Sequence, residues 1–182
     1  MKIIEGTVDE IIEYQTRTNQ VPPADDDETA APEKEALPTR STSALDSDDE
    51  EAFFIKQFVY TRAKDGGTAN RVLTFLDRAL ELKTVVAIGE SDRTHDGYTD
   101  YIMVRDQGPK KYGAVVYVKP GNGGLTLRLR PEDVNDLDDD RIKLRNVAQT
   151  QKYAVNCPLN DDDAVDLALV LTERALKKVR GN

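Results

Sequence analysis

Two short stretches of the sequence alternate large aliphatic residues with cations. In LTLRLR (125–130) leucines alternate with a threonine and two arginines, and in RIKLR (141–145) isoleucine and leucine alternate with three cations. Because successive side chains of a strand point to opposite faces, the aliphatic residues are expected to face the core and the cations the solvent. With one lysine from the preceding strand, the candidate binding residues are Lys119, Arg128, Arg130, Arg141, Lys143 and Arg145.

A basic sheet face of this kind could contact the phosphates of a nucleic acid, whose affinity for proteins comes largely from backbone neutralisation. If the two strands pair, five cations share one face. Five phosphate contacts would give a salt slope of about −4.5, at ~0.9 per phosphate. The plainer alternative is the solvated face of an antiparallel sheet, where arginine and lysine are common.

The other reactive residues match no catalytic or metal-binding pattern. Segment 90–100 collects four carboxylates and the single histidine, namely Glu90, Asp92, Asp96, Asp100 and His95. It lacks the D-x-D-x-D-G core of an EF-hand loop. ELK at 81–83 resembles a nuclease motif by its letters but ends a predicted helix, and Cys157 has no second cysteine. We therefore expect a binding module rather than an enzyme, with no cofactor and no metal.

The elements that must position these residues are predicted from periodicity and turn signals. Residues 52–64 and 69–83 favour helices, the second capped by Thr68. A last helix over 162–180 is capped by Asn160 or Asp161, with an acidic start and a basic end that suit the helix dipole. Strands are expected at 84–89, 98–106, 112–120, 125–130, 141–145 and 151–157. Short connections between successive strands predict an α+β fold, an antiparallel sheet with helices packed on one face.

The first third of the chain differs in composition from the rest. Residues 1–51 hold four cations and fifteen carboxylates, a net charge of −11, whereas residues 52–182 carry 21 cations and 19 anions. We expect a short strand and helix within 1–18, a disordered acidic linker over 19–51 and an α+β domain over 52–182. The N-terminus has no apolar signal segment, and no apolar run could span a membrane. A single cysteine fits a reducing compartment, so we expect a cytoplasmic protein without membrane contact.

The second half of the chain resembles a known but uncharacterised domain. The resemblance depends on four stretches: YIMVRD (101–106), the basic turn GPKK, the run YGAVVYVKPGNGGLTLRLRPEDV and the final QKYAVNCPLNDDDAVDLALVLTERAL. The domain is a small α+β unit, found alone or appended to predicted nucleases, and often labelled a predicted transport protein. The resemblance covers residues 98–179 and implies the fold. Family members tend to carry a His/Trp/Gly segment where RNVAQTQ stands here.

These observations lead to one expected function and one alternative. We expect association with nucleic acid, or with a nucleic-acid-processing partner, through the basic sheet face. The alternative is a protein-interaction or inhibitor module whose acidic N-terminal segment contacts a basic protein partner. A third hypothesis is that the acidic linker competes with an external polyanion for the basic face. The sequence does not indicate an oligomeric state.

Overall fold

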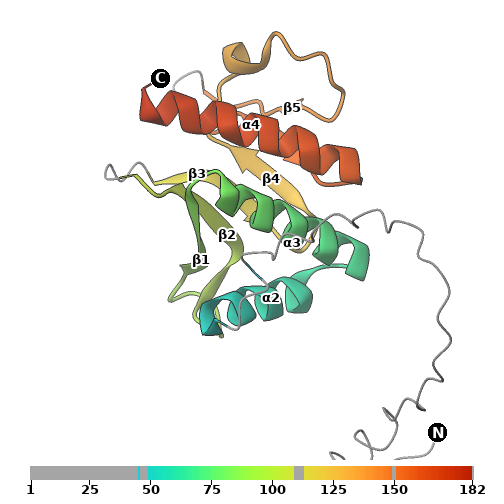
Figure 1. Cartoon of the computed structure of the whole chain (residues 1–182), viewed down its shortest axis with the longest axis vertical. Helices are drawn as coiled ribbons and strands as arrows, with labels where there is room; N and C mark the ends of the chain where they lie inside the picture. Colours follow the sequence, from blue (N-terminus) through green and yellow to red (C-terminus); the bar gives the residue numbers. More distant parts are fainter. Residues whose placement is uncertain (1–44, 46–48, 109–112, 149–150, 182) are drawn as a thin grey trace, which may run out of the picture. The chain divides into compact units, whose positions relative to one another are not determined.

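The computed structural model describes residues 45, 49–108, 113–148 and 151–181, which belong to one compact unit, Ser41–Asn182. The predicted strand and helix within 1–18, and most of the predicted linker, lie outside the described residues. The described part is an α+β fold, as the sequence predicts. Three helices pack on one face of a six-stranded antiparallel sheet (Figure 1).

Each of the three helices has an aspartate as its N-cap, the residue just before the first helical position. They are α2 (Glu50–Arg62), α3 (Gly66–Glu81) and α4 (Asp162–Arg180). The side chains of Asp49, Asp65 and Asp161 accept hydrogen bonds from backbone N–H groups of the first turns. The prediction that Thr68 caps the second helix is wrong, because Asp65 accepts from its N–H at 2.6 Å and Thr68 is buried within the first turn. An aspartate three residues earlier satisfies the free donor equally well.

The six strands follow the order β1-β2-β3-β4-β6-β5 across the sheet, and every pair is antiparallel. The first three strands match the predicted segments closely, whereas β5 keeps only two of the five residues predicted for its strand. The bounds are β1 (Thr84–Glu90), β2 (Tyr98–Asp106), β3 (Ala114–Lys119), β4 (Gly124–Leu127), β5 (Lys143–Leu144) and β6 (Val155–Pro158). A short 3-10 helix, η2 (Pro131–Val134), follows β4.

The two basic runs do not pair with each other. Strand β6 inserts between β4 and β5, so the run at 125–130 and the run at 141–145 are separated by a full strand. Leu144 pairs with the buried Val155 and so lies on the inner side of the sheet, as predicted, but its side chain is 55% exposed and does not join the core. Strand β5 is at the edge of the sheet, where few neighbouring side chains cover Leu144. Ile142, just before β5, does pack against the core.

The core lies between the helices and the inner face of the sheet. Helix α3 packs against α2, α4 and β1, and α4 packs against β3, β4 and β6. Leu45 also belongs to the core, and its N–H donates to Asp77 at 3.1 Å. Residues 49–51, which fall in the predicted linker, supply the N-cap and first turn of α2. The folded unit therefore starts earlier than residue 52.

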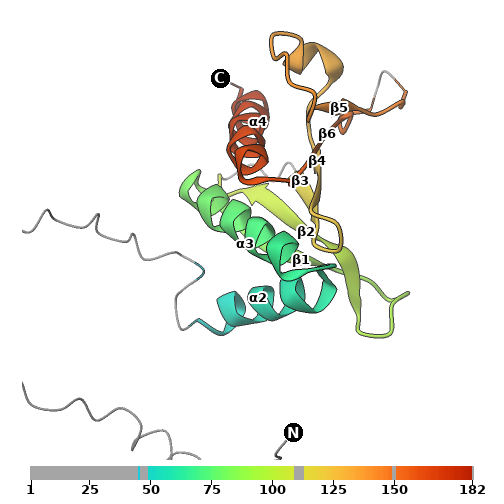
Figure 2. The ribbon, with the colours of Figure 1, turned by 90° about the vertical axis from the view of Figure 1, so that its right-hand side faces the viewer.

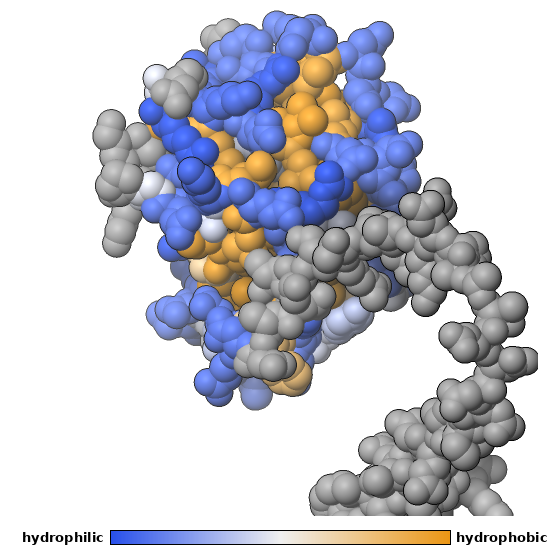
Figure 3. Space-filling view, viewed as in Figure 1, coloured by the Kyte–Doolittle hydropathy of each residue, from blue (hydrophilic) through white to orange (hydrophobic). Residues whose placement is uncertain are grey.

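Apolar side chains also reach the surface on the side of the helices. Figure 3 shows hydrophobic residues, in orange, between the hydrophilic residues of that side. The most exposed large ones on α2 are Phe53 and Tyr60, and α4 exposes Val170. No described helix is both long enough and apolar enough to cross a membrane.

Replacing the N-cap of α4 is expected to destabilise the fold. Asp161 accepts a hydrogen bond from the Ala164 N–H at 2.7 Å. Asp161→Ala should lower the free energy of unfolding by about 1 kcal/mol, since it leaves that donor unpaired. Urea denaturation followed by circular dichroism measures the loss. Asn160→Ala is the matched control, and an equal loss in that variant would contradict the assignment of the cap.

Candidate nucleic-acid interface

The face of the sheet opposite the helices presents a continuous row of side chains. We call this surface the outer face. Strand pairing aligns one residue of each strand from β2 to β5 on it, and Figure 2 shows that the three helices lie on the other side. The aligned residues are Met103, Tyr117, Thr126, Asn156 and Lys143. No described helix covers them.

Three tyrosines form a line of ring contacts along the outer face. The Tyr101 and Tyr117 rings meet edge to face with centroids 5.1 Å apart, and the Tyr117 and Tyr153 centroids are 5.2 Å apart. All three side chains are half-buried. Tyr101 comes from β2, Tyr117 from β3 and Tyr153 from the segment before β6. We call these three residues the tyrosine row.

Hydrogen bonds fix one end of the tyrosine row. The Tyr153 hydroxyl donates to the Ala114 carbonyl at 2.7 Å and interacts with the Arg128 guanidinium. Burial raises the pKa of Tyr153, with a smaller contribution from Tyr117, so its ring is neutral at physiological pH. A fixed, neutral ring beside a cation is suited to stacking with a flat π system.

Cations lie at both ends of the tyrosine row. At one end, Arg128 follows β4 and its N–H donates to the Val115 carbonyl at 2.9 Å, which continues the pairing with β3. At the other end, Lys119 forms an ion pair with Asp100 at 3.2 Å. On β2, the Arg105 guanidinium lies 3.2 Å from the Met103 sulfur, on the same face. The outer face thus combines aromatic rings with basic residues.

The structure disperses the six basic residues predicted as one patch. Lys119, Arg128 and Lys143 belong to the outer face, whereas Arg130 lies beyond the end of β4, where it approaches Glu132 at 3.5 Å. Arg145 donates to the Tyr153 carbonyl at 2.9 Å. Three of the six therefore share the outer face with the tyrosine row, and the set does not form a dense cluster.

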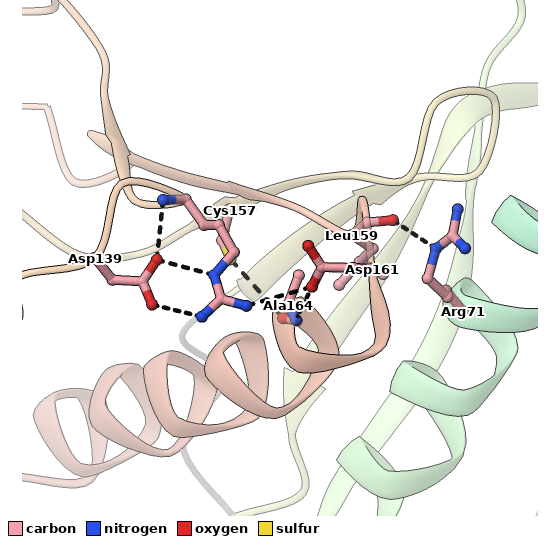
Figure 4. Close-up of polar contacts among 7 residues, drawn as sticks. Arg71, Asp139, Cys157, Leu159, Asp161 and Ala164 are labelled. Atoms are coloured by element: carbon pink, nitrogen blue, oxygen red, sulfur yellow. Dashed lines mark hydrogen bonds and ion pairs between the residues drawn. The ribbon is translucent and has the colours of Figure 1, made fainter.

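Arg141 has a structural environment that the alternating pattern does not reveal. Its guanidinium donates to Asp139 at 2.7 Å and 2.9 Å and approaches the N-cap Asp161 at 3.3 Å. Figure 4 labels both aspartates, Asp139 in the loop and Asp161 at the start of α4. It precedes β5 instead of lying in it. The sequence predicts Arg141 on a basic strand face, but its contacts tie the loop after η2 to the start of α4.

Replacing Arg141 is expected to lower stability in a pH-dependent way. Hydrogen bonds from the Arg141 side chain and N–H lower the pKa of Asp139 from 3.8 to about 2. A lowered pKa in the folded state stabilises the fold above pH 3.8, and this contribution is lost as the pH falls towards about 2. Arg141→Met should therefore lower the melting temperature by a few degrees at neutral pH, and the difference from the wild type should shrink over that acidic range.

Thermal unfolding of both proteins across the pH series measures this effect. Lys143→Met changes an exposed cation two residues away and serves as the control. Equal melting temperatures for Arg141→Met and the wild type at neutral pH would contradict the structural role of Arg141.

The carboxylates of segment 90–100 do not converge on one site. Asp96 pairs with Arg62 and accepts the Tyr98 N–H at 3.2 Å, whereas Asp100 pairs with Lys119. Within the described ranges, no group of three or more histidine, cysteine or carboxylate side chains is placed to hold a metal ion. Burial raises the pKa of the Cys157 thiol to about 11, which disfavours the thiolate needed for nucleophilic attack.

The tyrosine row is not among the binding residues predicted from the sequence. Tyr101 and Tyr117 sit at outward positions of two predicted strands, so the alternation that singled out the cations also marks them. Their contact with Tyr153 depends on the insertion of β6 beside β4, which the pattern does not predict.

Comparison of the chain with protein-family models, with curated proteins and with solved structures finds no match. The resemblance of residues 98–179 to the nuclease-linked domain therefore stays a prediction.

Proposed function

We propose that the outer face binds single-stranded nucleic acid, with bases on the tyrosine row and phosphates beside the flanking cations. The observation that carries this proposal is the line of three contacting rings on a sheet face that no described helix covers. Bases of a single strand stack on such rings, and each stack contributes ~1–3 kcal/mol. The nuclease-linked resemblance supports the same class of partner.

A single strand suits this surface better than a duplex. Bases within a duplex are stacked on one another and cannot reach the rings, whereas unpaired bases can be splayed out over a sheet. The basic residues are spread over the outer face, so they suit a flexible backbone that passes from Lys119 to Arg128. About three to four phosphate contacts would give a salt slope between about −2 and −3, at ~0.7 per phosphate for single strands.

A binding titration tests the proposed function. Fluorescence anisotropy of the full-length protein with labelled oligonucleotides of about 10 nucleotides compares DNA, RNA and a duplex of the same length across a salt series. We expect single strands to bind about tenfold more tightly than the duplex, with the shallow salt slope given above. Equal affinity for single strands and duplex would contradict stacking on the tyrosine row.

The protein-interaction alternative predicts a different result in the same titration. In that case the acidic N-terminal segment contacts a basic protein partner, and most of this segment lies outside the described residues. No oligonucleotide should then bind, even at low salt, because the ligand-binding residues would be carboxylates. Such an outcome would overturn the nucleic-acid proposal.

A further inference from the structure

A cationic cleft opens at the end of the sheet where β4 finishes. Its volume is about 220 Å³. Its described lining comes from the segment after β4, the segment before β6 and the last turn of α4. Among the described residues, those that line it are Arg128, Arg130, Lys152, Lys178 and Val179. We call this the terminal cleft.

Two carboxylates partly offset the four cations of the terminal cleft. Asp133 contacts the Lys178 ammonium and accepts the Arg130 N–H at 2.6 Å, and Glu132 lies 3.5 Å from the Arg130 guanidinium. Burial raises the pKa of Asp133, but its hydrogen bonds with Lys178 and the Arg130 N–H outweigh burial and lower it. Asp133 is therefore ionised, and these four cations and two carboxylates sum to a net charge of +2, which matches a doubly charged anion.

The terminal cleft continues the tyrosine row. Arg128 lines the cleft and also interacts with the Tyr153 side chain, and Lys152, which lines the cleft as well, immediately precedes Tyr153. Tyr153 in turn contacts Tyr117. A strand whose bases lie along the row would therefore bring its backbone to the mouth of the cleft.

We infer that the terminal cleft binds a phosphomonoester at the end of the single strand on the tyrosine row. This inference rests on the proposed function. A monoester carries ~1.5–2 negative charges at neutral pH, whereas each internal phosphodiester carries one, so the monoester matches the charge of the cleft better. The cleft is smaller than the roughly 300 Å³ at which sites for whole small molecules begin, which suits a phosphate group rather than a complete nucleotide.

Oligonucleotides that differ only at their ends test the inference. The full-length protein is titrated with one sequence in three forms, with a 5′-phosphate, with a 3′-phosphate and with hydroxyls at both ends. We expect one phosphorylated form to bind about tenfold more tightly than the hydroxyl form, because two charge-assisted contacts are added. Inorganic phosphate should remove this preference without displacing the hydroxyl form.

Two variants locate the preference. Lys152→Gln should reduce the ratio between the phosphorylated and hydroxyl forms to about twofold or less, while the hydroxyl form keeps its affinity. Lys119→Gln is the matched control, because Lys119 lies at the opposite end of the tyrosine row, and it should leave the ratio unchanged.

The outcomes separate this inference from the proposed function. If all three forms bind equally well, the terminal cleft does not select a phosphomonoester, although the proposed function stands. A preference that survives in Lys152→Gln and is lost in Lys119→Gln would place the phosphate at the other end and overturn the inference. If none of the forms binds at low salt, the proposed function fails first.

Discussion

Tyr117→Ala is expected to lower the affinity for single-stranded oligonucleotides by about 5- to 150-fold, equivalent to ~1–3 kcal/mol. Tyr117 is the central ring of the tyrosine row and touches both of the others. Its removal deletes one stacking surface and separates Tyr101 from Tyr153, so a base in the middle of the site loses its partner. Anisotropy titration against the same labelled strand measures the change.

Tyr117→Phe is the matched control for this prediction. Phenylalanine keeps the ring and lacks only the hydroxyl, so its affinity should stay within about twofold of the wild type if stacking is the interaction. Because Tyr117 is half-buried beside Met103 and Thr126, the melting temperature of each variant must be compared as well. Unchanged affinity in a folded Tyr117→Ala protein would contradict a role for the tyrosine row in binding.

Phe75→Ala is expected to cause the largest loss of stability, about 3–5 kcal/mol in the free energy of unfolding. Phe75 is fully buried in α3, the helix that packs against α2, α4 and β1. Alanine would remove the whole ring and leave a cavity in the core. The whole free energy of unfolding of a typical domain is only ~5–15 kcal/mol, so this one change is enough to unfold a large share of the molecules.

Urea denaturation of the two proteins measures the loss, and Thr74→Ala is the control. Thr74 is the preceding residue of the same helix and is exposed, so its replacement should change the free energy of unfolding by less than about 0.5 kcal/mol. A loss in Phe75→Ala no larger than in Thr74→Ala would contradict the position of α3 in the core.

Local patterns predicted most of the architecture. The first strands and the last helix were predicted nearly to their ends, because alternation and capping residues are signals within a few neighbouring positions. The pairing of the two basic runs was harder to predict. Strand β6 decides whether the run at 141–145 pairs with the run at 125–130. It comes about thirty residues after β4 in the chain and lies between the two runs in the sheet. Such non-local pairing leaves no mark in either run.

The candidate site was predicted only in part for the same reason. Alternation identifies outward residues, and it correctly puts Arg128 and Lys143 on the outer face. It cannot tell that Arg141 contacts Asp139 and Asp161, because the last of these ion-pair partners is twenty residues away. Lys178 reaches the terminal cleft from the end of a helix, so no strand pattern could have included it.

Mapping of the bound strand by amide chemical shifts tests the central claim most directly. Nuclear magnetic resonance spectra of the isotope-labelled full-length protein are recorded while a single strand of about 10 nucleotides is added. We predict that the largest shifts fall on outer-face residues of β2, β3 and β4 and on Tyr153, while α2 and α3 change little. Shifts confined to the helices or to residues 1–51 would contradict the outer face as the binding surface.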